Sequence, residues 1–460
     1  MKTRVFERRI HLPCTAAEAF AWHERRGAFQ RLTPPWEQVE VEQEGEGEHD
    51  GQRAVLRSRM GPVWVRWVAE HFGYEKDRQF CDRQLAGPFA FWEHTHRFEP
   101  AEGGGCWLTD HIEYRLPLEP FSGVAEGLVE ARLDRMFTYR HAVTAADLAG
   151  ALKRDCGVVV VSGASGLIGS ALVPFLRTQG WTVYTLVRRA PRTPDEIRWQ
   201  PAEGGDVEWP KGFACDAVIH LAGVGIASGR WSSARKAAIR GSRIHGTTTL
   251  VKALARLPRA PQVMLSGSAV GYYGPDGQGQ LQDEESEQGD GFLAEVCAAW
   301  EQAARPVEAL GTRLVLLRTG VVLSPAGGAL AKMLLPFRLG LGGPMAGGKM
   351  DQSWISLDDW LRACTFALEN DAISGPMNLT APWPVPQEEF ADTLGSVLNR
   401  PAVLPLPRWP LQLALGEIAD EALLADARVH PTVLSQNGFN FLHPSLEKAL
   451  RHVLGRNTGL

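Results

Sequence analysis

The sequence lacks features that mark several classes of protein. No stretch approaches the roughly 20 consecutive apolar residues that a membrane-spanning helix needs. There is no long basic run, and 48 basic residues stand against 53 acidic ones, so nucleic-acid binding has little support. The N-terminal stretch MKTRVFERRIHLP has no apolar core of signal-peptide length. We therefore expect a cytoplasmic protein with no membrane span and no nucleic-acid partner.

Paired cysteines are also missing. The seven cysteines are scattered and none forms a Cys-x-x-Cys pair, so we expect reduced thiols rather than disulfides or a zinc site. What is present is ordinary for a globular protein, with 44% hydrophobic and 22% charged residues. At 460 residues the chain is long enough for two or three domains.

A buried strand followed by a glycine-rich turn stands about a third of the way along the chain, in VVVVSGASGLIGS (158–170). The apolar run predicts a parallel strand, and the residues after it predict a helix. Glycines at 163, 166 and 169 permit a tight turn, close approach of a pyrophosphate, and close packing of the helix. The helix N-terminus would offer N–H groups to phosphates, although a strand–turn–helix without ligand remains the alternative. The predicted cofactor-binding residues here are Gly163, Ala164, Ser165, Gly166, Leu167, Ile168 and Gly169.

The next predicted strand, WTVYTLVRR, ends in Arg188 and Arg189. An acidic residue at this place would accept hydrogen bonds from a ribose 2′-hydroxyl and favour NAD. Guanidinium groups instead suit a 2′-phosphate, through charge and bidentate geometry. The pair therefore predicts NADP(H) as the cofactor, against the alternative of two solvated arginines at a strand end.

The spacing Gly-x-x-Gly-x-x-Gly resembles the extended and atypical short-chain dehydrogenase/reductase superfamily. The resemblance implies a Rossmann-type, doubly wound parallel sheet. It also implies that the strand in DAVIHLAG (216–223) lies beneath the dinucleotide, with Leu221, Ala222 and Gly223 lining it. Arg243, on the following helix, is a second phosphate candidate or else a surface arginine.

Typical members of that superfamily carry Tyr-x-x-x-Lys about 25 residues after a serine, and this chain departs from them. None of the six tyrosines has a lysine four residues on, and Phe292 or Leu293 stands at the expected tyrosine position. A phenyl or alkyl group cannot transfer a proton. In the strand QVMLSGSAVGYYG we therefore predict Tyr272 as acid/base, in preference to Tyr273, and Ser268 as the orienting group. The alternative is that both tyrosines only pack near the nicotinamide.

Later motifs resemble one atypical branch, the NAD(P)-dependent epimerase-family proteins of unknown substrate. They include Arg-Thr-Gly at 318–320, Leu-Gly-Leu-Gly-Gly at 339–343 and, in the tail, Val-x-Pro at 429–431. The resemblance implies a Rossmann domain over 157–380 and a small C-terminal module over 381–457. The glycine-rich run 339–348 predicts a loop at the rim of a substrate cleft, or else a structural loop. The predicted apolar walls of that cleft are Phe337, Met345 and Trp354.

Residues 1–150 are predicted to form a strand, a helix, about six alternating strands and a long final helix. This order resembles the helix-grip α+β fold of the START-like, polyketide cyclase-like (SRPBCC) superfamily, which implies an apolar cavity for a hydrophobic ligand. His94 and His96 share one strand face, and His111 is expected on a neighbouring strand. We favour structural histidines over a metal site. The segment 144–157 is read as the helix end and a short linker.

These patterns together predict an NADP(H)-dependent oxidoreductase or epimerase-like enzyme that acts on a small-molecule substrate. One alternative is a non-catalytic NADP(H)-binding regulatory module beside a hydrophobic-ligand domain. Another is an N-terminal carrier that delivers its ligand to the reductase domain. The sequence leaves the substrate and the oligomeric state open.

Overall fold

The computed structural model describes residues 2–43, 45, 47–117, 123–149, 156–227, 229–277 and 279–456. Two compact units are present: an N-terminal unit with most residues before Gly157, and a C-terminal unit with most residues from Gly157 to Val453. The predicted linker lies partly outside the described residues, at 150–155. The domain boundaries at 150, 157, 381 and 457 stay predictions.

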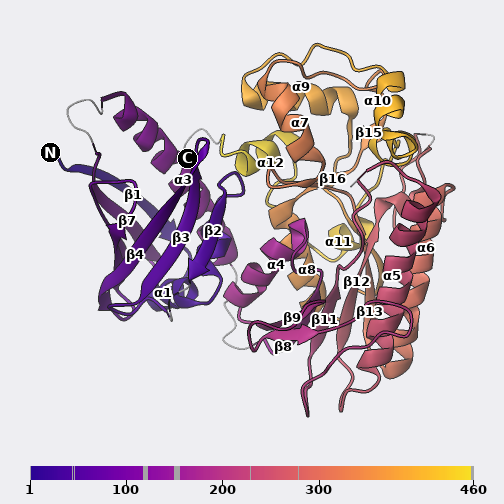
Figure 1. Cartoon of the computed structure of the whole chain (residues 1–460), viewed down its shortest axis with the longest axis horizontal. Helices are drawn as coiled ribbons and strands as arrows, with labels where there is room; N and C mark the ends of the chain where they lie inside the picture. Colours follow the sequence, from indigo (N-terminus) through magenta and orange to yellow (C-terminus); the bar gives the residue numbers. More distant parts are fainter. Residues whose placement is uncertain are drawn as a thin grey trace. The chain divides into compact units, whose positions relative to one another are not determined.

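The N-terminal unit is built on one antiparallel sheet of seven strands in the order β1-β7-β6-β5-β4-β3-β2. Only β1 and β7 are neighbours that lie far apart in sequence, so the rest of the sheet is a meander (Figure 1). The strands are β1 (Arg4–Leu12), β2 (Val39–Gln43), β3 (Arg53–Met60), β4 (Val63–Glu75), β5 (Gln79–Ala86), β6 (Phe91–Pro100) and β7 (Cys106–Arg115).

Three helices accompany this sheet: α1 (Ala16–Glu24), α2 (Ala28–Leu32) and the long α3 (Gly123–Asp147). Helix α1 begins with a capping box, since the Thr15 side chain accepts from the Glu18 N–H and the Glu18 carboxylate accepts from the Thr15 N–H at 2.8 Å. It buries Phe20 and Trp22 completely. Strand, helices, six strands and a long helix confirm the predicted helix-grip fold class.

The C-terminal unit is built on a parallel sheet of seven strands in the order β10-β9-β8-β11-β12-β13-β17. The chain runs outward from β8 in one direction, then returns to β11 and continues in the other, which confirms the doubly wound Rossmann-type class. The strands are β8 (Val158–Ser162), β9 (Thr182–Val187), β10 (Glu196–Arg198), β11 (Ala217–His220), β12 (Val263–Ala269), β13 (Arg313–Thr319) and β17 (Gly375–Leu379).

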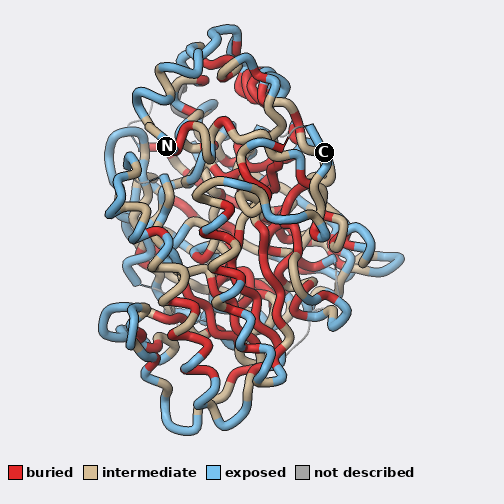
Figure 2. Tube along the Cα trace, turned by 90° about the vertical axis from the view of Figure 1, so that its right-hand side faces the viewer, coloured by how far each residue is buried: buried red, intermediate tan, exposed pale blue. Residues whose placement is uncertain are grey.

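Helices cover both faces of this parallel sheet, so its central strands are buried on both sides. All four residues of β11 are buried, as a parallel strand between two helix layers requires. Figure 1 shows α5 and α6 along one face and α4 and α8 on the other, and Figure 2 shows buried residues in the interior of the trace and exposed ones on its outer turns. These helices are α4 (Leu167–Thr178), α5 (Ser233–Leu254), α6 (Phe292–Ala304) and α8 (Leu357–Glu369). Short 3-10 segments follow β12 and α6: η1 (Val270–Tyr273) and η2 (Arg305–Leu310).

The remainder of the C-terminal unit adds two small sheets and several helices. Strand β14 (Val321–Leu323) pairs with β16 (Trp354–Ser356), and β15 (Asp351–Gln352) pairs with β18 (Val385–Pro386). The helices are α7 (Gly328–Arg338), α9 (Gln387–Leu398), α10 (Arg408–Leu415), α11 (Thr432–Gln436) and α12 (Leu446–Val453), with a π-helical turn η3 (Ala419–Leu423).

Two buried carboxylates link residues between 432 and 443 to the rest of the C-terminal unit. Glu284 accepts N–H groups from Asn378 on β17 and from Thr432 and Val433 at the start of α11, at 2.9–3.2 Å. Asp359 in the first turn of α8 accepts the N–H groups of Leu442 and His443. Burial raises the pKa of both carboxyls. Among the described residues, no helix combines the length and apolar character that a membrane crossing requires.

Candidate functional site

The predicted cofactor residues gather at the edge of the parallel sheet where its strands end, here called the carboxyl edge. The glycine loop follows β8, the arginine pair follows β9, and residues 221–223 follow β11. Strands β8 and β11 are parallel neighbours. Strands before β11 are added on one side of β8, and strands from β11 onward are added on the other side, so the strand order reverses between them. Crevices at such reversal points are where doubly wound sheets bind ligands.

The three positions of the glycine loop differ in how they would tolerate a side chain. Gly163 has φ +77°, and a Cβ there would lie 2.8 Å from the Leu221 carbonyl carbon and 2.9 Å from the Ala222 nitrogen. A Cβ at Gly169 would overlap the Gly163 carbonyl oxygen, so the helix packs directly on the loop. A Cβ on Gly166 would meet only that same oxygen, at 3.3 Å, and no other atom outside the adjacent residues lies within 4 Å of it. Ser165 and Gly166 are exposed, so the loop leaves room for a phosphate at the start of α4.

The two predicted phosphate-binding arginines differ in their surroundings. Arg189 pairs with both carboxylate oxygens of Glu196 at 2.5 and 2.7 Å, and this contact lowers the pKa of Glu196 to about 2. Arg188 is exposed, and no hydrogen bond or ion pair joins it to another described residue. Glu196 was not predicted as a partner, because that carboxylate comes from the edge strand β10. Arg188 is thus a cation that remains available at the end of β9.

The segment 221–223 lies against the glycine loop. The Ser162 hydroxyl, at the end of β8, accepts the Leu221 N–H at 3.2 Å and contacts His220 Nδ1 at 2.6 Å. Burial lowers the pKa of His220 to about 4. A Cβ on Gly223 would lie 3.3 Å from the Arg243 guanidinium carbon. Arg243 therefore reaches this edge, but its Nη1 already donates to the Val224 and Ile239 carbonyls.

The predicted catalytic hydroxyls lie at the end of β12 in a network that sequence reasoning missed. The Ser268 hydroxyl donates to Glu301 on α6 at 2.7 Å, and Arg318 on β13 binds the same carboxylate through two nitrogens at 2.9 and 3.0 Å. Arg318 also donates to the Tyr273 hydroxyl at 3.1 Å, which in turn donates to Asn378. Arg318 and Glu301 are only 2% and 4% exposed, so the ion pair is fully desolvated.

Tyr272 and Tyr273 are therefore not equivalent. Burial raises the pKa of Tyr273 to about 12, and its hydroxyl is used twice inside the network. Tyr272 is half-buried, and its ring centroid lies 3.5 Å from the Arg318 guanidinium carbon. No hydrogen bond joins its hydroxyl to another described residue. Tyr272 is thus the phenol that a bound molecule could engage.

A signal for Arg318 was present in the sequence. It is the one charged residue inside the apolar run LVLLRT (314–319). In the sheet it lies directly opposite Ser268. A cation near the end of a buried strand needs a partner, but the packing that brings Glu301 on α6 to Arg318 is not readable from sequence.

The three predicted cleft residues, Phe337, Met345 and Trp354, are all buried in the C-terminal unit. A Cβ on Gly342 would overlap the Phe337 ring, since it would lie 2.6 Å from it. Their role as cleft walls stays a prediction. The run 339–348 contains no helix or strand, as its glycines predicted.

Helix α7 crosses the carboxyl edge. At its start, Cβ atoms on Gly327 and Gly328 would lie 3.2 and 3.3 Å from the side chain of Leu167 in the glycine-loop helix. Farther along, the Lys332 ammonium donates to the Ala227 carbonyl, in the loop after β11, at 3.2 Å. Large apolar side chains are exposed at and beyond its end: Leu335 (67%), Leu339 (64%) and Leu341 (59%).

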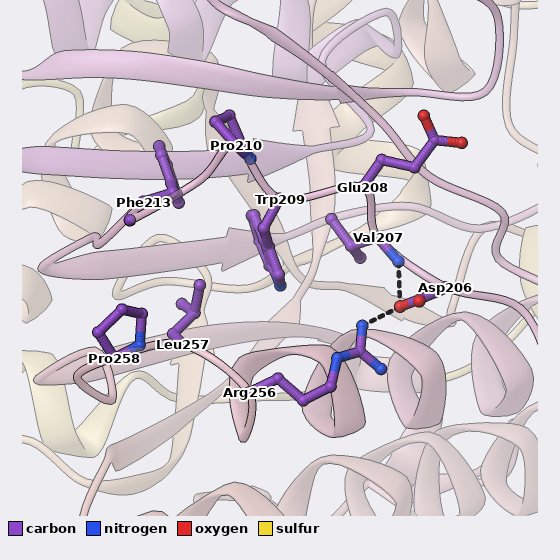
Figure 3. A pocket seen from close by; sticks show the side chains of 10 residues that line it. Asp206, Val207, Glu208, Trp209, Pro210, Phe213, Arg256, Leu257 and Pro258 are labelled. Atoms are coloured by element: carbon purple, nitrogen blue, oxygen red, sulfur yellow. Dashed lines mark hydrogen bonds and ion pairs between the residues drawn. The ribbon is translucent and has the colours of Figure 1, made fainter.

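A separate hollow, drawn in Figure 3, has a volume of about 440 Å³. Its lining residues precede β11 or β12, so it lies at the opposite, amino edge of the sheet. Trp209 and Phe213 stack there with ring centroids 5.3 Å apart, and Asp206 contacts Arg256. None of the predicted site residues lines it, and it is not part of the candidate site.

In the N-terminal unit, the prediction that two histidines share one strand face is confirmed. His94 and His96 lie on the same face of β6, with ring centroids 3.9 Å apart. His111 does lie on the neighbouring β7, but it is opposite Thr95 and binds Glu7 at 2.9 Å. Asp110, one residue earlier, is the group that faces the histidine pair.

Comparison with protein families gives three matches along the chain. Residues 159–379 match the NAD dependent epimerase/dehydratase family. Residues 406–453 match a domain of unknown function, DUF1731. Residues 3–140 match the polyketide cyclase / dehydrase and lipid transport family.

Individual relatives and solved structures agree with these matches. An epimerase family protein of Mycobacterium bovis is 45% identical over 299 residues, which are 65% of this chain and 98% of the relative. The structure of a nucleoside-diphosphate sugar epimerase from Corynebacterium glutamicum is 30% identical with a TM-score of 0.80, covering 98% of this chain and 90% of that one. The human epimerase family protein SDR39U1, crystallised with NADPH, is 36% identical with a TM-score of 0.59, covering 64% and 98%.

Proposed function

Because the chain belongs to the NAD-dependent epimerase/dehydratase family, we propose that its C-terminal unit binds NADP(H) and uses it in an oxidoreductase or epimerase-like reaction. The observation that carries the choice of NADP(H) is Arg188, a cation without a partner among the described residues at the end of β9. The NADPH bound to the human relative supports the same choice.

The residues at the carboxyl edge fit such a dinucleotide. The pyrophosphate would lie on the glycine loop, where Gly166 is exposed and the first N–H groups of α4 have no partner within the helix. Arg188 would bind the 2′-phosphate, while Arg189 keeps Glu196 away from it. Leu221, Ala222 and Gly223 would lie beneath the dinucleotide, with Arg243 beside Gly223.

When bound, NADP(H) supplies or accepts a hydride, and the chain must handle the accompanying proton. We assign this proton to the Tyr272 hydroxyl, because the Tyr273 hydroxyl is already used as donor and acceptor. The Arg318 guanidinium over the Tyr272 ring would stabilise negative charge on the phenol, a role usually taken by lysine. Ser268 orients the site indirectly, since its hydroxyl holds Glu301.

The substrate side of the proposal rests on helix α7. The exposed Leu335 on this helix and the exposed Leu339 and Leu341 in the following loop offer apolar surface, and the helix begins against Leu167 of the glycine-loop helix. We therefore propose a small or medium-sized, partly apolar substrate that carries a carbonyl or hydroxyl group. Sugar nucleotides belong in the assay panel because the Corynebacterium structure is that of a nucleoside-diphosphate sugar epimerase.

Arg188→Ala tests the cofactor choice. The variant loses a charge-assisted contact worth about 1.5–3 kcal/mol, so we expect NADPH affinity to fall about 10- to 100-fold while NADH affinity stays unchanged. Calorimetry on the full chain measures both. Arg198→Ala is the control, since it removes an exposed arginine one strand further out. Equal losses in the two variants, or equal losses for the two dinucleotides, would refute the assignment.

Tyr272→Phe tests the chemical step. We expect kcat to fall by about 10²–10⁴ because a positioned proton donor is lost, with NADPH affinity within about twofold. Turnover would be followed by NADPH absorbance over carbonyl, enone and sugar-nucleotide substrates. Tyr273→Phe is the comparison variant and should lower stability first, because its hydroxyl belongs to the buried network. Full kcat in Tyr272→Phe would remove this residue from the mechanism.

A further inference from the structure

A second cluster of chemically capable side chains lies in the N-terminal unit, outside the proposed dinucleotide site. Asp82 on β5 is directly opposite His94 on β6, and His96 is directly opposite Asp110 on β7. Residues opposite one another in an antiparallel sheet share a face, and so do His94 and His96, two apart on one strand. All four side chains therefore project from the same face of the sheet.

The distances within the cluster are short. His94 Nδ1 lies 3.2 Å from an Asp82 oxygen, and its Nε2 lies 3.0 Å from an Asp110 oxygen. One ligand atom from each of Asp82, His94 and His96 lies within 4.8 Å of the other two. Two imidazoles and a carboxylate at this separation are a common set of ligands for a divalent transition metal.

Surrounding groups fix the orientation of both imidazoles. Asp110 binds His94 Nε2, and its other oxygen is held by His141 on α3 at 2.6 Å. Phe80 stacks on His96 with centroids 4.4 Å apart, and Phe137 meets the His94 ring edge-on at 5.4 Å. A carboxylate that holds the second nitrogen of a histidine is the usual outer partner of a metal ligand.

One nitrogen in the cluster, Nδ1 of His96, has no hydrogen bond that accounts for its burial. His96 Nδ1 is buried and lies 2.7 Å from an Asp110 oxygen, yet it has no hydrogen-bond partner of acceptable geometry. A buried polar atom of this kind calls for an explanation, and a bound ion or water is one that native structures offer. The side chains of Asp82 and His96 keep 19% and 13% exposure, so an ion has a way in.

We propose that Asp82, His94 and His96 bind one divalent transition-metal ion of the zinc type, with Asp110 as the positioning carboxylate. Three protein ligands leave a fourth position for water or for a ligand oxygen, which is the arrangement of catalytic rather than structural zinc sites. The N-terminal unit would then bind a molecule that carries a carbonyl, hydroxyl or carboxylate oxygen. The metal site uses none of the residues assigned to NADP(H).

Metal binding by the unmodified full chain is the first test. The protein is stripped with a chelator, dialysed against zinc chloride and then against metal-free buffer, and its zinc content is measured by mass spectrometry. We expect one equivalent of zinc, and visible absorption bands of four-coordinate cobalt when cobalt(II) is added instead. The absence of both retained zinc and cobalt bands would overturn the proposal, and neither result depends on a variant that must fold.

Variants then locate the ion. His96→Gln should weaken zinc binding by at least the roughly 10- to 100-fold typical of outer-sphere changes, and Asp82→Asn should act likewise. His111→Gln, on the other face of β7, is the matched control and should keep full binding. His443→Gln probes the other cluster of possible ligands among the described residues, Asp358, His443 and His452, and should also keep it. Undiminished binding in a folded His96→Gln protein, checked by circular dichroism, would overturn the proposal.

Discussion

Replacing Gly163 by alanine is expected to abolish most dinucleotide binding. The residue has φ +77°, which strains any side chain by about 1–3 kcal/mol. The new Cβ would also lie 2.8–2.9 Å from the backbone of Leu221 and Ala222, so the loop must shift. If two phosphate contacts of about 1.5 kcal/mol each are lost, NADPH affinity falls about 100-fold.

Two further glycine variants separate the causes of that loss. Gly204→Ala introduces the same kind of strain at φ +70° but meets no atom within 4 Å, so it should leave NADPH affinity unchanged. Gly166→Ala has ordinary backbone geometry and should leave the free energy of unfolding unchanged. It should lower NADPH affinity, because its methyl group would occupy the space assigned to the pyrophosphate. Calorimetry and thermal unfolding measure both quantities. Normal NADPH binding by Gly163→Ala would contradict the placement of the cofactor.

Glu301→Gln is expected to be the most destabilising of the single changes considered. It leaves the guanidinium of Arg318, 2% exposed, without its counter-charge. Removing one partner of a buried pair costs about 3–5 kcal/mol. The change also alters the acceptor of the Ser268 hydroxyl, so the hydrogen bonds at the end of β12 should weaken as well.

The matched control for this change is an ion pair at the surface. Asp206→Asn breaks the contact with Arg256, where both side chains are more than half exposed, and such pairs contribute at most about 1 kcal/mol. Urea unfolding of both variants gives the comparison. Equal midpoints would mean that the Arg318–Glu301 pair does not stabilise the C-terminal unit.

Features with a local cause were predictable from the sequence. The glycine loop was recognised because its three glycines follow a four-valine strand, and two of the three positions are sterically intolerant of a side chain in the fold. The helix-grip unit was recognised because its strands alternate along the chain. Both signals lie within short stretches, so neither needed knowledge of long-range contacts.

Features that depend on strand register were not predictable. Arg188 and Arg189 are adjacent in sequence, but only Arg189 meets Glu196, which arrives from another strand. His111 lies on the neighbouring strand as expected, but Asp110 is the residue that faces the histidine pair, because adjacent residues of a strand point to opposite faces. Arg318 acquires its role from partners on other elements, Glu301 on α6 and the Tyr273 hydroxyl.

The most direct test of the account is the affinity of the unmodified chain for NADPH and for NADH. The account places Arg188, which has no partner in the described part of the chain, at the 2′-phosphate. Calorimetry should therefore give NADPH at least about 10-fold tighter binding, the value of one charge-assisted contact. Equal affinities for the two dinucleotides, or no binding of either, would contradict it.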